Sequence, residues 1–151
     1  MAIILVLSGP NLNLLGEREP HIYGTATLDD LVGDIQAVAS AAGHAVEHVQ
    51  SNHEGELVDA VQAARGRCAA IIVNAGALSH YSYALADALA TYDGVAVELH
   101  ISNPSARDAW RHLSVIAPVV TGTIAGFGRT GYRLAAEATV AALAAATPDA
   151  R

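Results

Sequence analysis

Five short runs rich in valine and isoleucine constrain the fold of this chain more than any other feature. They are AIILVLS (2–8), AVEHVQS (45–51), AAIIVNA (69–75), GVAVELH (94–100) and VVTGTIAG (119–126). Segments with helical periodicity separate them. Buried strands that alternate with amphipathic helices are typical of a parallel sheet covered on both faces. The pattern predicts one α/β domain over residues 1–151, with a five-stranded parallel sheet and a flavodoxin-like, doubly wound topology.

The helix after the first strand is the clearest of the predicted helices. Thr27 is a suitable N-cap, Asp30 follows three residues later, and apolar residues then recur at helical spacing as far as Gly43. The remaining helical segments are expected at about 54–64, 81–92 and 132–146, with a short turn at 107–112 and a frayed tail from about 147.

Composition excludes several classes of function. The net charge of -7 and the lack of basic clusters argue against a nucleic-acid surface. Lysine is absent, which excludes a Schiff-base lysine and a P-loop lysine. The single cysteine, Cys68, leads into an apolar run and is expected to be a buried packing thiol. The apolar stretches are too short to span a bilayer, so we expect a soluble, cytoplasmic protein with no membrane partner.

Every polar motif follows one of the predicted strands. GPNLN, SNHEG, NAGALSH, HISNPSAR and GFGRTG come after the first to the fifth strand in turn. The carboxyl ends of parallel strands meet at one edge of the sheet, and ligands bind there in such folds. A functional site is therefore predicted at this edge.

Several of these motifs have a structural and a functional interpretation. Glu98 and His100 share a strand face, so the carboxylate could orient an acid–base imidazole, although the pair alone fits a structural histidine slightly better. Arg107 and Arg111 could bind a ligand, but alone they fit pairing with surface carboxylates better. GFGRTG fits a tight strand-to-helix turn better than a dinucleotide fingerprint. No metal-ligand spacing is present, so no metal site is predicted.

The segment GPNLNLLGEREPHIYG (9–24) reads as a long loop or lid, and it carries Arg18 and Tyr23. A tyrosine with an ordinary pKa of about 10 is a poor base at neutral pH. A neighbouring guanidinium stabilises the phenolate form. A phenolate base, a histidine acid and asparagine donors suit proton abstraction next to a carbonyl, followed by loss of a leaving group, without a cofactor.

The motifs together resemble the type II 3-dehydroquinate dehydratases. GPNLNLLGEREPHIYG, QSNHEGEL, NAGALSH, ELHISNPSAR and GFGRTGY occur in the order and spacing of that family, and the match covers nearly the whole chain. The resemblance implies elimination of water from 3-dehydroquinate to give 3-dehydroshikimate in the shikimate pathway of aromatic amino acid biosynthesis. It also implies a homo-oligomer, a dodecamer built from trimers, and no metal or other cofactor.

The resemblance further implies a role for each matching residue. Tyr23 would remove the C2 proton with help from Arg18, Asn11 would hold a water that stabilises the enolate, and His100, oriented by Glu98, would protonate the departing hydroxyl. The residues implied in substrate binding are Asn74, His80 and Arg111 for the ring hydroxyls, the amides of Ile101 and Ser102 for the carboxylate, and Asp87 from across a subunit interface.

Some positions depart from the family pattern, and some alternatives stay open. Tyr81, Tyr83, Ala86 and Val115 replace residues usual in the family and could alter subunit contacts or the rim of the site. The same elimination on an amino analogue of dehydroquinate, or a catalytically silent binding module of the same fold, would share many of these features. Whether the role is biosynthetic or catabolic is left open.

Overall fold

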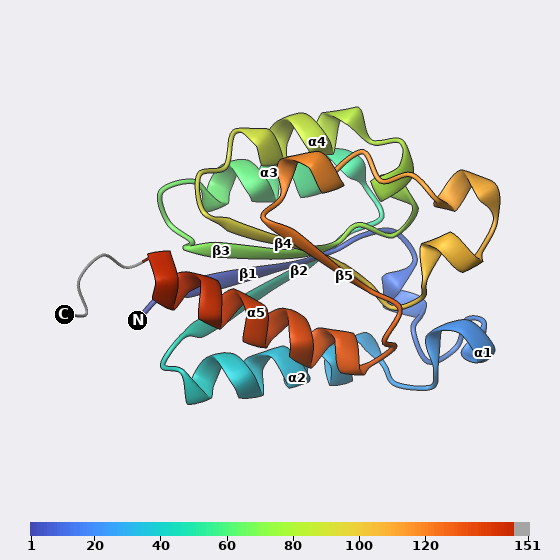
Figure 1. Ribbon diagram of the computed structural model, residues 1–151, viewed down its shortest axis with the longest axis horizontal. Coiled ribbons are helices and arrows are strands. Elements are labelled where there is room, and N and C mark those ends of the chain that lie inside the picture. The colour runs from blue at the N-terminus through green and yellow to red at the C-terminus, as the bar shows by residue number, and fades with distance from the viewer. Residues whose placement is uncertain (147–151) are drawn as a thin grey trace.

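A computed structural model describes residues 1–146 and contains a five-stranded sheet (Figure 1). All neighbouring strands are parallel, in the order β2-β1-β3-β4-β5. The predicted α/β fold with a five-stranded parallel sheet is confirmed, while the predicted frayed tail from 147 lies outside the described residues. The strands are β1 (Ile3–Ser8), β2 (Ala45–Gln50), β3 (Ala70–Asn74), β4 (Val95–His100) and β5 (Gly122–Ala125).

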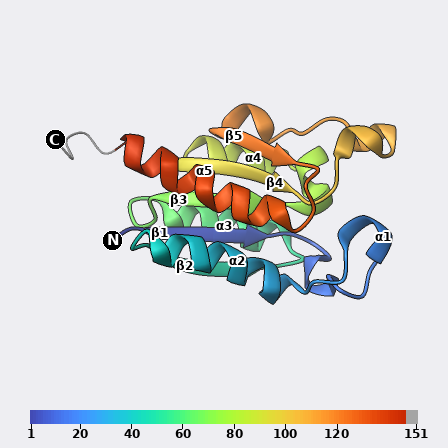
Figure 2. The ribbon, with the colours of Figure 1, turned by 60° about the horizontal axis from the view of Figure 1, so that its bottom comes forward.

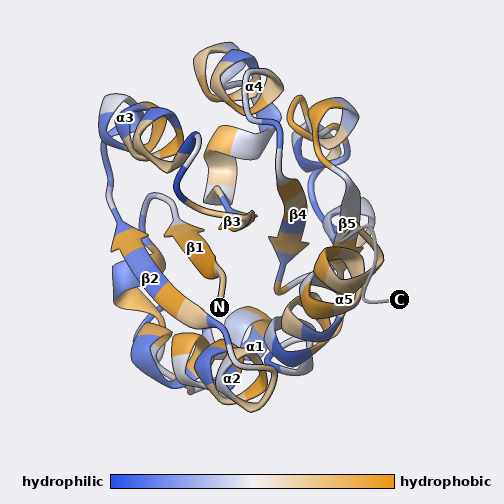
Figure 3. Ribbon diagram, turned by 90° about the vertical axis from the view of Figure 1, so that its left-hand side faces the viewer, coloured by the Kyte–Doolittle hydropathy of each residue, from blue (hydrophilic) through white to orange (hydrophobic). Residues whose placement is uncertain are grey.

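Two layers of helices cover the sheet, as the view along the strands shows (Figure 3). One layer holds α2 (Leu28–Ala41) and α5 (Thr130–Ala146), and the other holds α3 (Glu54–Ala64) and α4 (Tyr83–Ala90). Side chains alternate along a strand, so Ile4 packs in the core on the α2 and α5 side while Leu5 packs in the core on the α3 and α4 side. Both faces of the central strands are therefore apolar, which explains the continuous apolar runs of the sequence. None of the helices within residues 1–146 is long and apolar enough to cross a bilayer.

The helix boundaries follow local capping. The predicted capping box forms, with Thr27 Oγ1 accepting from the Asp30 N–H and an Asp30 carboxylate oxygen accepting from the Thr27 N–H, so α2 begins at Leu28. The helix predicted over about 81–92 is present as the shorter α4. It begins at Tyr83 because the Ser82 hydroxyl caps it by accepting from the Leu85 N–H, and a separate 3-10 helix, Gly76–His80, precedes it.

The segment 9–24 is more ordered than a plain loop. It contains a 3-10 helix, Leu12–Leu14, and a short helix α1 (Pro20–Tyr23), which stands beyond the carboxyl ends of the strands (Figure 2). Pro20 at the first helical position is the signal that the loop prediction missed. Tyr23 is thus the last residue of a helical turn.

The crevice of the sheet lies where strand order reverses, between β1 and β3. There the Gly9 N–H donates to the Asn74 carbonyl oxygen at 2.8 Å. A Cβ at Gly9 would lie 2.3 Å from the Ala75 carbonyl oxygen, so only glycine permits this approach. The chain leaving β1 is thereby held against the end of β3.

The connections that follow β4 and β5 also begin at this edge. Between β4 and β5 the chain forms 3-10 helices at Pro104–Ala106, Ala109–Arg111 and Ala117–Val119, so the predicted turn at 107–112 is part of a longer irregular excursion (Figure 1). GFGRTG forms the predicted strand-to-helix turn, with Gly126 and Gly128 at positive φ between β5 and α5. Cys68 is buried in the core, as predicted.

Candidate active site

A cavity at the carboxyl edge of the sheet brings most of the predicted site residues together. Two of them lie outside it: Glu98 lies behind His100, and Asp87 is exposed on α4. The predicted residues that line the cavity are Asn11, Arg18, Tyr23, Asn74, His80, His100, Ile101, Ser102 and Arg111.

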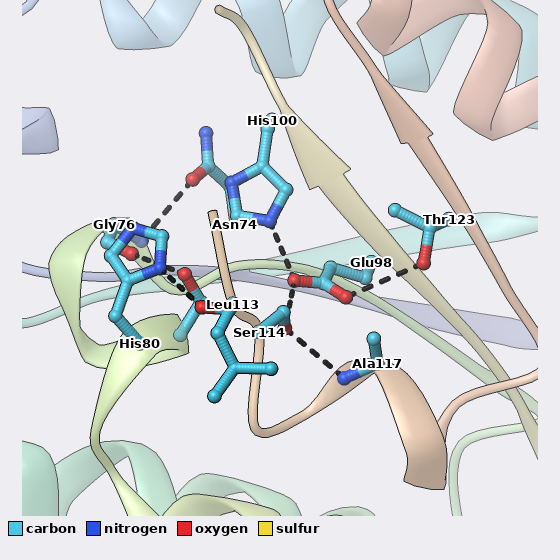
Figure 4. Close-up of polar contacts among 10 residues, drawn as sticks. Asn74, Gly76, His80, Glu98, His100, Leu113, Ser114, Ala117 and Thr123 are labelled. Carbon is cyan, nitrogen blue, oxygen red and sulfur yellow. Dashed lines mark hydrogen bonds and ion pairs between the residues drawn. The ribbon is translucent and has the colours of Figure 1, made fainter. Parts of the chain in front are cut away.

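His100 is held by a buried carboxylate. Its Nε2 lies 2.5 Å from Oε2 of Glu98, whose side chain is fully buried on the same strand (Figure 4). Ser114 Oγ donates to the same oxygen at 2.6 Å, and Thr123 Oγ1 donates to the other oxygen at 3.4 Å. Because a carboxylate only accepts, Nε2 of His100 carries a hydrogen, and Nδ1 is the nitrogen left for a ligand. The structure thus brings Glu98 and His100 into contact, as expected from their spacing on one strand.

Tyr23 is held by two guanidinium groups. Arg18 Nη2 donates to its hydroxyl oxygen at 3.3 Å and Arg107 Nη1 donates at 2.8 Å. Both guanidiniums also lie over the ring, with their central carbons 4.4 Å and 5.3 Å from its centre. Two cations therefore lie against the oxygen and the ring of one phenol.

Arg107 is a cavity residue to which the family resemblance gave no role, although the sequence offered it with Arg111 as a residue that could bind a ligand. It also lines the cavity, and it donates to Ser102 Oγ at 3.2 Å. Taken alone, the spacing of Arg107 and Arg111 favoured ion pairs with surface carboxylates. Within residues 1–146 neither arginine forms such a pair. Its position four residues before Arg111 was the available signal, but 84 residues separate it from Tyr23 and local spacing cannot show that contact.

Asn74 has both ends of its amide fixed. Its Nδ2 donates to the Tyr132 hydroxyl at 3.0 Å, and its Oδ1 accepts from the Gly76 N–H at 3.2 Å. Burial raises the pKa of Tyr132 to about 12, so the phenol stays neutral. One N–H and one lone pair of Asn74 remain for a ligand. Tyr132 is a contributor that the sequence did not reveal.

His80 presents an acceptor. Its Nδ1 lies 2.7 Å from the Leu113 carbonyl oxygen, so this nitrogen carries the hydrogen (Figure 4). Burial lowers the pKa of His80 below its usual 6.5, and the ring is therefore neutral at neutral pH. Nε2 then has a free lone pair. The ring lies nearly parallel to that of His100, with centres 6.4 Å apart.

The other predicted residues form the ends of the cavity. Asn11 has a left-handed backbone (φ 68°), and its N–H donates to Asn52 Oδ1 at 3.0 Å, which fixes it at the end of β1. Asparagine tolerates this conformation better than most residues. Ile101 is buried and Ser102 half-buried directly after β4. The Arg111 guanidinium carbon lies 4.0 Å from the centre of the Trp110 ring.

Comparison with known proteins places the chain in one family. The family model for dehydroquinase class II matches residues 2–140. The chain is 53% identical to a 3-dehydroquinate dehydratase of Roseiflexus castenholzii over 89% of this chain and 85% of the relative. It is 49% identical to a catabolic 3-dehydroquinase of Penicillium rubens over 89% and 86% of the two chains.

A solved structure shows the same fold. The crystal structure of the type II dehydroquinase from Butyrivibrio crossotus is 44% identical, covers 91% of this chain and 97% of its own, and superposes with a TM-score of 0.87. The sequence match, the structural match and the arrangement of polar side chains at the sheet edge point the same way. The chain belongs to the class II dehydroquinase family.

Proposed function

We propose that this protein eliminates water from 3-dehydroquinate to give 3-dehydroshikimate, as the names of its relatives suggest. One observation carries the proposal. A tyrosine oxygen that accepts from two arginines and a histidine backed by a buried carboxylate line the same cavity. Those are a base and an acid for two proton transfers in one reaction.

The first step is proton abstraction. Tyr23, as a phenolate stabilised by Arg18 and Arg107, removes the proton at C2, next to the C3 ketone. The electron pair of the C–H bond moves onto the ketone oxygen and forms an enolate. A water held by Asn11 donates a hydrogen bond to that oxygen, which stabilises the charge where it develops.

The second step is loss of the hydroxyl. The enolate re-forms the ketone and the C1–O bond breaks. His100, which enters the reaction with a hydrogen on both ring nitrogens, gives the proton on Nδ1 to the departing oxygen, which leaves as water. Tyr23 has gained one proton and His100 has lost one, so their exchange with solvent restores the enzyme. Glu98 keeps the imidazole oriented throughout the cycle.

The remaining cavity residues bind the substrate. Nε2 of His80 accepts from a ring hydroxyl, the free N–H of Asn74 donates to one, and Arg111 donates to another. The backbone amides of Ile101 and Ser102, directly after β4, take the carboxylate. Amide groups at the carboxyl end of a parallel strand suit an anion.

The assembly is also part of the proposal. We expect a cytoplasmic homo-oligomer, a dodecamer built from trimers, in which Asp87 reaches the site of a neighbouring copy. Asp87 is exposed on α4, and Tyr81 and Tyr83 nearby are 59% and 73% exposed, so this surface is available for subunit contacts. Ala86 and Val115 pack against the core beneath the surface.

The test is an assay of the purified protein with 3-dehydroquinate, following the absorbance of the conjugated enone. Tyr81→Phe serves as a matched control for Tyr23→Phe, because Tyr81 does not line the cavity. We expect full turnover in the control and nearly none in Tyr23→Phe. No enone from the wild type would contradict the proposal, and binding by calorimetry without product would indicate a silent binding module.

A further inference from the structure

Trp110 is the single tryptophan of the chain, and it lies on the 3-10 turn Ala109–Arg111, beside two residues that line the cavity. Its side chain is 54% exposed. An indole contributes most to stability when buried, so packing into the core does not explain this residue. Its two ring contacts are with Arg111 and His80, both of which line the cavity.

The contact with Arg111 is a cation–π contact. The guanidinium carbon lies 4.0 Å from the centre of the indole. Within residues 1–146 Arg111 forms no ion pair with a carboxylate, and its buried Nε has no hydrogen-bond partner. The indole face therefore orients the cation without occupying its donors. A carboxylate in the same place would neutralise the charge and compete with a ligand for those donors.

The contact with His80 is edge-to-face. The two rings are perpendicular, with centres 5.5 Å apart. The His80 ring is also held by the Leu113 carbonyl oxygen at Nδ1 and lies parallel to His100 on another side. Trp110 thus completes the packing that fixes the ring plane, and with it the direction of the Nε2 lone pair.

We infer that Trp110 is a positioning residue for substrate binding, an inference that rests on the proposed function. It holds Arg111 and His80 in the orientation in which they meet the ring hydroxyls, without touching the substrate itself. Preorganisation of this kind lowers the cost of ordering side chains when a ligand binds. The proton-transfer groups, Tyr23 and His100, are not in ring contact with Trp110.

Three variants separate the role of the aromatic face from that of bulk. We expect Trp110→Ala to raise KM about three- to tenfold with kcat within about twofold of wild type, since a cation–π contact aids binding before and during the reaction equally. Trp110→Phe keeps a π face and should stay within about twofold of wild type in KM. Trp110→Leu fills space without a π face and should behave like Trp110→Ala. Phe127→Ala, which removes an exposed aromatic outside the cavity lining, is the matched control.

The lone tryptophan also gives a readout that needs no variant. Binding of 3-dehydroshikimate engages Arg111 and should change the wild-type tryptophan fluorescence in a saturable way. An unchanged emission while calorimetry shows binding would overturn the inference. So would a wild-type KM in Trp110→Ala, or a fall in kcat of that variant with no change in KM. The same KM in Trp110→Leu and Trp110→Phe would overturn it as well. A wild type without turnover would instead sink the proposed function.

Discussion

The two proposed proton-transfer groups are mounted on very different parts of the molecule. His100 ends β4, an interior strand of the sheet, and its partner Glu98 has no exposed surface. Tyr23 ends α1, which stands outside the two helix layers, and its hydroxyl is held by arginines from two separate connecting segments (Figure 2). The acid is therefore built into the core of the fold, whereas the base is assembled by surface segments.

This difference has a physical cause and a consequence. A buried carboxylate destabilises the folded protein unless it accepts hydrogen bonds. The contacts that orient His100 therefore also stabilise the fold. Tyr23 is only half-buried, and the segment that carries it is bounded by Gly16 and Gly24, both at positive φ. Such glycines are suited to hinges that let a segment close over a ligand. Changes to the acid should affect stability and rate together, and changes to the base should affect rate alone.

The largest effect is expected from Tyr23→Phe. Removal of the phenol oxygen deletes the base and leaves the ring packing, so kcat should fall by about 10³ to 10⁴ while the melting temperature stays near that of wild type. Steady-state assays and thermal denaturation monitored by circular dichroism measure the two quantities. If Tyr23→Phe keeps a tenth of the wild-type rate, another group is the base.

Glu98→Gln should have a smaller effect on rate but a larger effect on stability. The amide presents an N–H where His100 or Ser114 now donates, so kcat should fall about a hundredfold and the free energy of unfolding by about 1–3 kcal/mol. Urea denaturation gives the second value. Glu47→Gln, which changes an exposed carboxylate, is the control. Unchanged stability in Glu98→Gln would mean that the acid is no more tied to the core than the base.

Arg107→Ala tests how the base is assembled. The Arg107 contact with the phenol oxygen is shorter than that of Arg18, 2.8 Å against 3.3 Å, so its loss should lower kcat at neutral pH by about tenfold or more. Steady-state kinetics measure kcat and KM separately. A rise in KM with an unchanged kcat would assign Arg107 to substrate binding instead.

Contacts between residues close in the sequence could be predicted, and contacts between distant segments could not. Glu98 and His100 are two residues apart on one strand, and Thr27 and Asp30 three apart at a helix start, so strand and helix geometry alone shows that they meet. The contact between Arg107 and Tyr23 joins positions 84 residues apart, and that between Asn74 and Tyr132 joins positions 58 apart. No local period encodes such contacts, since they depend on how the connections cross the sheet edge.

The smallest effect is expected from a histidine outside the cavity lining. His48 on the edge strand β2 lies 2.9 Å from Ser8 Oγ through its Nε2, and burial lowers its pKa below the usual 6.5. The unfolded chain then binds a proton more readily than the folded one, so folded stability falls as the pH drops through 6.5 toward the lowered pKa of the native state. His48→Gln should flatten this part of the stability curve, measured by urea denaturation across that range, and should leave kcat at neutral pH unchanged. Neither proton-transfer group contacts His48, so a fall in kcat would show that the strands and the site are coupled beyond Glu98 and His100. An unchanged dependence of stability on pH would show that His48 titrates alike in the folded and unfolded chain.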